Sequence, residues 1–344
     1  MNRIGICGHY GGNKVFLDGQ TIKTKVLTQE VENTLGEECV LKMDTYGGKK
    51  KLFSHIIHLI KLFYKCKSII ILPAYNSLRI FAPILVLLNR FNTRKLYYVV
   101  IGGWLPDYLV KKKWLIRILV KFDCIFVETS TMKNRMEKLG LTNVEIVPNC
   151  KYLKVLKSNC LRLRDKKPFD LCTFSRVTKE KGIEDAIEAV KRINIGNDLK
   201  YTVTIYGQVD PQYENRFRYL EECFPSYIRY GGEIPFEDSV NTVKDYFALL
   251  FPTRFKTEGI PGTILDAYAS GVPVISARWQ SYADLVIEGE TGLGYEIGDI
   301  DDLIRILNIV ADNPCIINDM KKNCLTEVEK YLPWNAFAPV IERL

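Results

Sequence analysis

Short apolar runs alternate with longer segments of helical periodicity along the whole chain. In the first half, the apolar runs are residues 3–8, 39–44, 68–72, 95–101, 124–127 and 144–147. The segments between them repeat apolar residues every three or four positions, as amphipathic helices do. Strands that alternate with helices of this length form a parallel sheet with helices on both faces. The first half therefore predicts a doubly wound α/β domain.

A second set of the same kind follows a break in the alternation. Residues 150–168 are basic, mixed in polarity and end in a proline, which is typical of an interdomain connection. Apolar runs then recur at 169–174, 201–207, 227–235, 245–252 and 271–276. Because 344 residues are many for a single core, we expect two domains. The predicted parts are a first domain at 1–155, a linker at 156–168 and a second domain at 169–331.

The stretch 258–271, EGIPGTILDAYASG, is the first candidate for chemistry. Its two acids, Glu258 and Asp266, are eight positions apart, which is slightly more than two helical turns. Pro261 is tolerated in a first helical turn and Gly262 lets a ligand approach the backbone, so a helix is expected to begin here. The first N–H groups of a helix are a seat for phosphate. An anion seat with two carboxylates suggests a sugar nucleotide; an ordinary acid on a solvated helix face is the alternative.

Two cations follow the first apolar run of the second domain. Arg176 and Lys181 are five positions apart in SRVTKEKG, and Gly182 opens the next helix. Arginine offers a bidentate fork and lysine a point charge, so together they suit a diphosphate. A solvated charged turn is the alternative, and Lys179 competes for the role of the lysine.

The acid-x7-acid stretch, taken with Arg176 and Lys181, resembles retaining glycosyltransferases of family 4, which have the GT-B fold. The resemblance implies two Rossmann-like domains that face a cleft, with a C-terminal helix at 332–344 that returns to the first domain. It also implies that Arg176 and Lys181 hold the donor diphosphate and that Glu258 holds sugar hydroxyls. The family has a glutamate as its second acid, whereas this chain has Asp266, which would meet the ribose.

The other donor-side positions also come from the resemblance. Gly11 and Gly12 match a Gly-Gly loop that faces the donor phosphates, and the backbone near Ile234 matches the segment that meets the base. The phosphate-binding turn after the first acid corresponds to Gly259, Ile260, Pro261, Gly262 and Thr263. The spacing G-x-x-G-G at 8–12 is not the dinucleotide fingerprint, which disfavours a dehydrogenase.

Three residues are expected on the acceptor side of the first domain. His9 lies in the glycine loop, although a lone loop histidine is often incidental. Trp104 and Asp107 lie in GGWLPD, where Gly102 and Gly103 allow a sharp turn. Relatives carry a histidine hereabouts that touches the donor sugar, and this sequence has none. Two alternatives stay open: Trp104 or Asp107 faces the acceptor, or Trp104 is merely packed in the core.

Charge is unevenly distributed along the chain. Residues 1–165 hold 28 Lys and Arg against 12 Asp and Glu, a net +16, whereas residues 166–344 hold 20 against 28, a net −8. Apolar helices within 49–67 and 111–122 carry much of the excess, which is the composition of helices that lie on an anionic bilayer. Solvated lysines on helices that face the sheet are the alternative. Nucleic acid is not expected as a partner, because no nucleic-acid-binding motif accompanies the charge.

The remaining composition narrows the setting. Apolar residues make up 47% and charged residues 26%, as in a globular protein. Ten cysteines without C-x-x-C spacing indicate a reducing compartment, and neither a secretory signal nor a membrane span is expected. We therefore expect a cytoplasmic protein, peripheral on the inner face of the cell membrane. Asp299 and Asp301 precede a helix and predict a cap, so neither a metal nor another cofactor is expected.

These expectations converge on transfer of a hexose or N-acetylhexosamine from a nucleoside-diphosphate sugar, with UDP favoured. The acceptor is expected to be a glycan or a lipid-linked oligosaccharide, in capsular, exopolysaccharide or O-antigen synthesis. A nucleotide-sugar epimerase of the same fold is one alternative and would act without an acceptor. A non-catalytic sugar-nucleotide-binding subunit is the other and would bind UDP without turnover.

Overall fold

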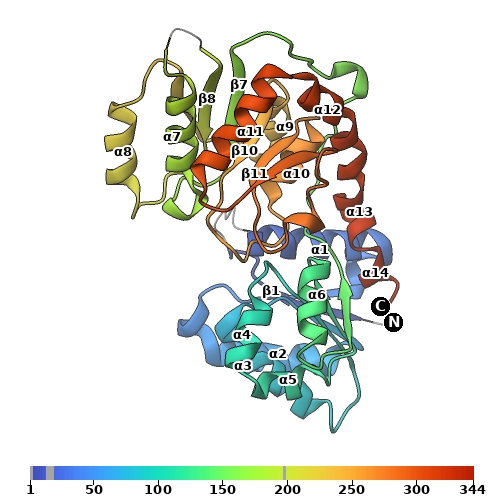
Figure 1. The fold of residues 1–344 in the computed structure, drawn as a ribbon. Coiled ribbons are helices and arrows are strands. Elements are labelled where there is room, and N and C mark those ends of the chain that lie inside the picture. Colours follow the sequence, from blue (N-terminus) through green and yellow to red (C-terminus); the bar gives the residue numbers. More distant parts are fainter. Residues whose placement is uncertain (1–2, 13–18, 197–198) are drawn as a thin grey trace. The chain divides into compact units, whose positions relative to one another are not determined.

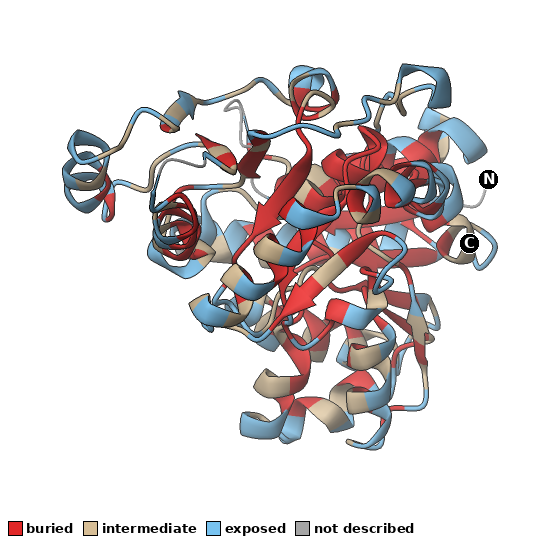
Figure 2. Ribbon diagram, turned by 45° about the horizontal axis from the view of Figure 1, so that its top comes forward, coloured by how far each residue is buried: buried red, intermediate tan, exposed pale blue. Residues whose placement is uncertain are grey.

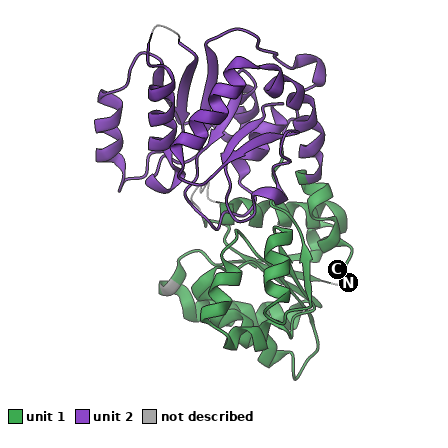
Figure 3. Ribbon diagram, in the orientation of Figure 1, with its two compact units in different colours: residues 1–152, 331–344 green, residues 153–330 purple. Residues whose placement is uncertain are grey.

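The computed structural model describes residues 3–12, 19–196 and 199–344, which fall into two compact units. Unit 1 comprises residues 1–152 and 331–344, and unit 2 comprises residues 153–330 (Figure 3). Each unit has one six-stranded sheet whose paired strands are all parallel. The predicted α/β class with two doubly wound parallel sheets is confirmed. The segment expected as a linker, 156–168, belongs to unit 2.

The sheet of unit 1 has the strand order β2-β1-β3-β4-β5-β6. Its strands are β1 (Ile4–Gly8), β2 (Val40–Asp44), β3 (Ser68–Ile71), β4 (Lys95–Val99), β5 (Cys124–Val127) and β6 (Val144–Ile146). Its helices are α1 (Gly19–Leu35), α2 (Leu52–Lys65), α3 (Tyr75–Leu88), α4 (Leu105–Lys111), α5 (Trp114–Leu119), α6 (Ser130–Glu137), α13 (Pro333–Ala336) and α14 (Ala338–Ile341). Helices α2 to α6 share one apolar cluster with the sheet, and α1 and the last two helices share another (Figure 1). The expected return of the chain's end to the first domain is therefore seen as two short helices.

The sheet of unit 2 has the strand order β12-β11-β10-β7-β8-β9. Its strands are β7 (Phe169–Phe174), β8 (Tyr201–Tyr206), β9 (Ile228–Gly232), β10 (Ala248–Phe251), β11 (Val274–Ala277) and β12 (Gly292–Tyr295). Its helices are α7 (Ile183–Ile193), α8 (Glu214–Glu222), α9 (Ser239–Val243), α10 (Gly262–Ala269), α11 (Ile300–Asp312) and α12 (Cys315–Glu327). Short 3₁₀ turns occupy Glu37–Cys39, Gly48–Lys51, Ser158–Cys160, Lys179–Lys181, Phe236–Asp238, Tyr282–Asp284 and Val328–Tyr331.

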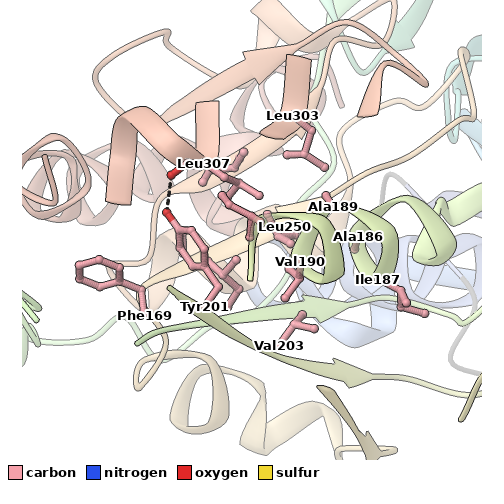
Figure 4. Close-up of a cluster of buried hydrophobic side chains, with 14 of the residues drawn as sticks. Phe169, Ala186, Ile187, Ala189, Val190, Tyr201, Val203, Leu250, Leu303 and Leu307 are labelled. Atoms are coloured by element: carbon pink, nitrogen blue, oxygen red, sulfur yellow. Dashed lines mark hydrogen bonds between the residues drawn. The ribbon is translucent and has the colours of Figure 1, made fainter. Parts of the chain in front are cut away.

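The hydrophobic pattern explains these layers. Inner strands such as β3 are buried at every position, because helices cover both faces of a doubly wound sheet (Figure 2). Helix α7 shows the helical pattern instead, with its buried apolar residues at Ile183, Ala186, Ile187, Ala189, Val190 and Ile193. In the core of unit 2, α7 and α11 pack together, and the Tyr201 hydroxyl donates to the Leu307 carbonyl over 2.7 Å (Figure 4). No described helix is long and apolar enough to cross a membrane.

The strand order also marks where ligands bind in each unit. In unit 1 the chain reverses its direction across the sheet between β1 and β3, and in unit 2 between β7 and β10. Loops on either side of such a switch point diverge, which leaves a crevice at the carboxyl ends of the strands. The residues singled out in the sequence follow β1, β4, β7 and β10, so most of them lie at or next to the two switch points.

Candidate active site

The carboxyl ends of β7 and β10 bring the main predicted residues of unit 2 together. The two strands are neighbours in the sheet, with Ala248 opposite Leu171. The chain leaves β7 through residues 175–182 to reach α7, and it leaves β10 through residues 252–261 to reach α10. Both loops therefore lie at the switch point of unit 2.

Lys181 and Glu258 form an ion pair between these two loops, although they are 77 positions apart in the chain. Only 20% of the lysine side chain and 14% of the glutamate side chain are exposed, so water screens the pair weakly. The Thr253 hydroxyl donates to the Glu258 carboxylate over 3.2 Å, and the lysine ammonium lies 5.4 Å from the centre of the Phe251 ring. The site thus holds one cation and one anion in defined positions.

Two glycines allow the backbone of these loops to come close together. Gly182 has a φ of 67°, and a β-carbon there would lie 1.8 Å from the Pro252 carbonyl oxygen. Gly207 follows β8 with a φ of 127°, and a β-carbon there would lie 2.0 Å from the Ser175 carbonyl oxygen. A side chain fits at neither position. The sequence pointed to Gly182 as the start of a helix but gave no sign of the role of Gly207.

Arg254 fastens the two loops to each other. Its backbone N–H donates to the Glu180 carbonyl oxygen over 2.8 Å, and its guanidinium Nε donates to the Asp185 carboxylate over 2.8 Å. The side-chain bond to Asp185 raises the pKa of Arg254 above its ordinary value. Asp185 lies in the first turn of α7, so the loop after β10 is anchored to the helix that follows β7. Sequence reasoning missed Arg254, because its partners are distant in the chain.

Arg176 and Ile234 are the other donor-side residues at this edge. Arg176 lies two residues after the end of β7, between Ser175 and Val177, and it is exposed. No carboxylate of the residues the structure describes pairs with it, so its charge is available to an anionic ligand. Ile234 is half-buried after β9, at the same carboxyl edge and two strands away from β7. The structure therefore places both residues at the edge where the sequence predicted a ligand.

Helix α10 begins at Gly262, as the sequence predicted. The buried residues of the preceding turn are Gly259, Ile260 and Pro261. The Thr263 hydroxyl donates to the Phe174 carbonyl oxygen at the end of β7, which fixes the first turn of the helix beside that strand. The first-turn N–H groups, which carry the positive end of the helix dipole, therefore lie close to the loop that holds Arg176.

Asp266 differs from the expected arrangement. Its relative exposure is 3%, and its carboxylate accepts a hydrogen bond of 2.8 Å from Ser239 Oγ of α9. The second acid of the motif thus connects α10 to the helix packed against it, and it does not stand on an open surface beside Glu258. A position on the buried side of α10 causes this, since five of its neighbours from Ile264 to Ala269 are buried as well. The ribose contact stays a prediction.

In unit 1 a carboxylate organises the glycine loop after β1. Asp44, the last residue of β2, accepts hydrogen bonds from the N–H groups of Tyr10 at 2.9 Å and Gly12 at 2.8 Å. Burial acts to raise the pKa of Asp44, but these backbone bonds outweigh it and lower the pKa below its ordinary value. Gly11 and Gly12 have φ values of 90° and 57°, which only glycine adopts readily. The glycine loop was expected to face the donor phosphates, and its Gly12 N–H is engaged by a carboxylate of the protein itself.

Trp104 belongs to an aromatic cluster at the ends of β3 and β4. Its ring is stacked on Tyr75 with centroids 4.1 Å apart, and it meets Tyr108 edge-on at 5.4 Å. Its indole N–H donates to the Ile101 carbonyl oxygen over 2.9 Å. Tyr75 is 47% exposed, so the cluster presents an aromatic surface to a ligand. The sequence singled out Trp104 alone; the signal for Tyr75 was its place at the start of the helix that follows a buried strand.

His9 and Asp107 are both engaged by neighbours. His9 Nδ1 lies 2.7 Å from Thr21 Oγ1, and Asp107 is paired with Arg135 of α6. These contacts hold the two side chains within unit 1. Of the three residues expected on the acceptor side, Trp104 is thus the one whose surroundings offer an open binding surface.

A buried ion pair supports the turn that carries Trp104. The Lys23 ammonium lies 2.9 Å from the Glu128 carboxylate, with side chains 0% and 3% exposed. Glu128 also accepts a hydrogen bond of 3.0 Å from the Gly102 N–H, and Lys23 donates to the Val100 carbonyl over 3.1 Å. Sequence reasoning missed this pair, because a lysine in an amphipathic helix normally indicates a solvated position.

Comparison with known proteins connects this geometry to a family. The family model for glycosyl transferases group 1 matches residues 162–326, which include Arg176, Lys181 and Glu258. The matched segment is similar to this family. It accounts for nearly all of unit 2.

Individual relatives agree with the family model. Amylovoran biosynthesis glycosyltransferase AmsK of Erwinia amylovora is 27% identical over 221 residues, which cover 60% of this chain and 51% of that protein. The chain spans about half the length of the curated relatives it matches. Among solved structures, Anabaena Alr3699/HepE in complex with UDP has a TM-score of 0.75 at 13% identity, covering 100% of this chain and 99% of that one. The lipopolysaccharide outer core galactosyltransferase WaaB has a TM-score of 0.74 at 18% identity, covering 100% of both chains. The predicted GT-B fold is confirmed.

The carboxylates considered as metal ligands have structural partners in unit 2. Asp299 caps α11 as the sequence predicted, with its side chain accepting a hydrogen bond of 2.9 Å from the Asp302 N–H. Asp301 pairs with Arg192. Across residues 3–12, 19–196 and 199–344, no group of three or more His, Cys, Asp or Glu is placed to hold a metal ion. Arg176 and Lys181 carry positive charge at the switch point of unit 2.

Proposed function

We propose that the protein is a retaining, metal-independent glycosyltransferase that moves a hexose or N-acetylhexosamine from a UDP-sugar to a lipid-linked glycan acceptor. The observation that carries the proposal is the Lys181–Glu258 pair at the switch point of unit 2, within the segment that matches the family model for glycosyl transferases group 1. A cation suited to phosphate and a carboxylate suited to sugar hydroxyls are held side by side there, as a sugar diphosphate requires. The exposed Arg176 supplies a second cation at the same edge.

In the proposed reaction, the bond between the sugar C1 and the diphosphate oxygen breaks, and a bond between C1 and the acceptor hydroxyl oxygen forms. Arg176, Lys181 and the first-turn N–H groups of α10 stabilise the charge that develops on the leaving diphosphate. Preorganised donors of this kind contribute roughly 3–4 kcal/mol each in other enzymes. The acceptor attacks from the face that the diphosphate leaves and gives its proton to the leaving phosphate. The configuration at C1 is therefore retained.

Glu258 acts at two stages of this proposal. Without ligand it neutralises Lys181, as the ion pair shows. When the donor binds, the lysine turns to the diphosphate, and the carboxylate is released to accept hydrogen bonds from sugar hydroxyls. Thr253 Oγ1, which already donates to Glu258, keeps the carboxylate oriented during the exchange.

The relatives support the classes of donor and acceptor. HepE was solved in complex with UDP, which supports a uridine nucleotide as the donor's carrier. AmsK is named for amylovoran biosynthesis and WaaB for the lipopolysaccharide outer core, which supports a surface polysaccharide as the product. Capsular, exopolysaccharide or O-antigen synthesis at the inner face of the cell membrane is the proposed setting.

The proposed membrane contact is through the basic helices of unit 1. Phe53 of α2 is 78% exposed and Trp114 of α5 is 44% exposed, each next to lysines in the sequence. Such a surface binds anionic lipid through both apolar insertion and charge. Flotation with vesicles of phosphatidylcholine and phosphatidylglycerol should carry the protein at low salt and less of it at high salt. Failure to float at low salt would contradict the membrane contact without touching the donor site.

A thermal-shift screen of nucleotide sugars tests the central proposal. Ligands that bind the native state raise the melting temperature, so UDP and one or a few UDP-sugars should do so, with loss of the effect in Arg176→Ala. The UDP-sugar found in this way is then incubated with and without a lipid-linked acceptor. Acceptor-dependent release of UDP supports a transferase. Release of UDP with an altered sugar and no acceptor would indicate an epimerase, and binding without turnover would indicate a silent subunit.

A further inference from the structure

A cavity of about 650 Å³ opens in unit 1 between α2, α3 and α5. Its apolar walls are formed by Leu52, Ile80, Phe81 and Trp114, and Arg79 lies at its edge. The volume is within the range of about 300–1,000 Å³ that is typical of small-molecule sites. None of the donor-side residues lines it.

The cavity lies close to the switch point of unit 1. Among its lining residues, Thr45 follows β2, and Asn76 and Ser77 follow β3 at the start of α3. Tyr75, the residue before Asn76, is the exposed member of the aromatic cluster that contains Trp104. The cavity and the aromatic cluster are therefore adjacent along one edge of the sheet. One ligand that carries both an apolar chain and a sugar reaches the two together.

The surroundings of the cavity are strongly cationic. Residues 44–123, which include all the lining residues, contain 15 Lys and Arg and three acids. Each acid has partners of its own: Asp44 accepts from the N–H groups of Tyr10 and Gly12, Asp107 pairs with Arg135, and Asp123 pairs with Lys95. Arg79 at the edge of the cavity has no ion-pair partner among the residues described by the structure. An uncompensated guanidinium beside an apolar cavity favours an anion, above all a phosphate, which it binds bidentately.

Helix α2, which contributes Leu52 and His55 to the cavity, also carries exposed apolar side chains outside it. Phe53, Ile57 and Tyr64 follow one another along the outer side of α2, with exposures of 78%, 38% and 55%. Trp114 lines the cavity and is still 44% exposed. Large apolar side chains that cluster on a solvent-exposed face mark a surface that a partner covers.

We propose that this cavity binds the apolar chain of a lipid phosphate, with Arg79 on the phosphate and the Tyr75–Trp104 surface on the first sugar of the acceptor. The inference rests on the proposed function for the identity of the acceptor. The apolar walls disfavour a free glycan, because sugar hydroxyls packed against Ile80, Phe81 and Trp114 would lose hydrogen bonds. Polar groups of Thr45, His55, Asn76 and Ser77 complete the lining. The cationic rim rejects a neutral or positively charged lipid in favour of an anionic one. An amphiphile with a phosphate headgroup satisfies both conditions.

Binding of monomeric alkyl phosphates to the full-length protein tests this proposal. Dodecyl phosphate, kept below its micelle-forming concentration, should bind at least about tenfold more tightly than butyl phosphate, because each added methylene leaves water for the cavity. Saturation is followed by calorimetry. Equal affinity for the two chain lengths would overturn the proposal. So would tight binding to phosphatidylglycerol vesicles without saturable binding of dodecyl phosphate, since the surface would then be a general membrane contact.

Two matched variants on α3 test whether the apolar chain of the lipid phosphate lies in the cavity. Ile80→Glu places a charge in the cavity and should weaken dodecyl phosphate binding about tenfold or more. Leu87→Glu makes the same change two turns later on a side chain that is 55% exposed and lies outside the cavity, and should bind within about twofold of wild type. Equal effects of the two variants would contradict the assignment. Near-ultraviolet circular dichroism verifies folding, and Trp114→Phe, which keeps an aromatic wall, should retain binding if the cavity is intact.

Two further readouts separate this inference from the proposed function. Arg79→Gln should weaken dodecyl phosphate binding about tenfold while Arg90→Gln, an exposed cation beyond the end of α3, should not. UDP binding is measured in the same samples and should be unchanged in all of these variants. Loss of alkyl phosphate binding with intact UDP binding would mean that the substitution affects the cavity and not the donor site. Absent UDP binding in wild type with chain-dependent alkyl phosphate binding would reject the proposed function and keep the lipid site.

Discussion

Replacing Lys181 by methionine removes one charge from the site and leaves its shape nearly unchanged. The ammonium contacts the Glu258 carboxylate and lies 5.4 Å from the centre of the Phe251 ring, whereas the rest of the side chain is an apolar stem that methionine reproduces. Lys179→Met is the matched control. It makes the same change at an exposed position of the same 3₁₀ turn.

The structure predicts that Lys181→Met affects folding less than it affects turnover. Loss of the ammonium leaves Glu258 with Thr253 Oγ1 as a hydrogen-bond donor, and removing one partner of a largely buried pair costs about 1–3 kcal/mol. Native proteins of this kind have unfolding free energies of roughly 5–15 kcal/mol, so most of the variant stays folded. A donor preorganised for the leaving diphosphate supplies about 3–4 kcal/mol to turnover, which is a factor of roughly 10²–10³. Turnover should therefore fall far more than stability.

The assay follows UDP release from the UDP-sugar identified by thermal shift, in the presence of acceptor, alongside urea unfolding of each protein. Lys181→Met should lose about 10²–10³ in kcat, and Lys179→Met should stay within about threefold of wild type. Near wild-type turnover in Lys181→Met would refute the diphosphate assignment. If Lys179→Met were the inactive protein instead, the cationic role would move to that residue.

Three more predictions follow from the same contacts. Glu258→Gln frees Lys181 from its ion pair, so calorimetry should show tighter UDP binding while turnover falls; weaker UDP binding would contradict the exchange of partners. Gly182→Ala should lower the free energy of unfolding in urea by at least about 2 kcal/mol, because the alanine would have a left-handed φ and its β-carbon would clash with the Pro252 carbonyl oxygen. Gly298→Ala is the control: Gly298 has a φ of 80° but open space around it, so this substitution should cost less. Burial lowers the pKa of Lys321 to about 8, so the folded protein releases a proton that the unfolded chain keeps between pH 8 and about 10. The penalty for burying the charged ammonium is present in full below pH 8 and fades above it. From pH 7 to 9.5, the unfolding free energy of the wild type should therefore rise relative to that of Lys321→Met.

The hydrophobic pattern of the chain was sufficient to predict the layers of the fold. Strands of a doubly wound sheet are buried on both faces and helices on one, so each type leaves its own period in the sequence. The start of α10 at Gly262 and the cap of α11 at Asp299 were predicted for a related reason. Proline, glycine and aspartate act on the backbone within a few residues of themselves, and such effects do not depend on what packs nearby.

The partners of the site residues depended on the order of the strands. The sequence indicated that Lys181 and Glu258 each follow a strand, but only the placement of β10 beside β7 brings them into contact across 77 positions. The same dependence explains the residues that were missed. Gly207, Arg254 and the buried Lys23 have ordinary neighbours in the chain, and what distinguishes them is a carbonyl or carboxylate that the fold brings from elsewhere.

By itself, the sequence determined two α/β domains, a helix start suited to phosphate and a pair of cations suited to a diphosphate. Tertiary structure decided how each charge is used. It buried Asp266 against Ser239, gave the Gly12 N–H to Asp44 and paired Lys181 with Glu258, and it opened the cavity beside the aromatic cluster. The physical reason is one of range. Backbone preference and periodicity act over a few residues, whereas burial and pairing of charged groups are set by contacts between segments that only the fold brings together.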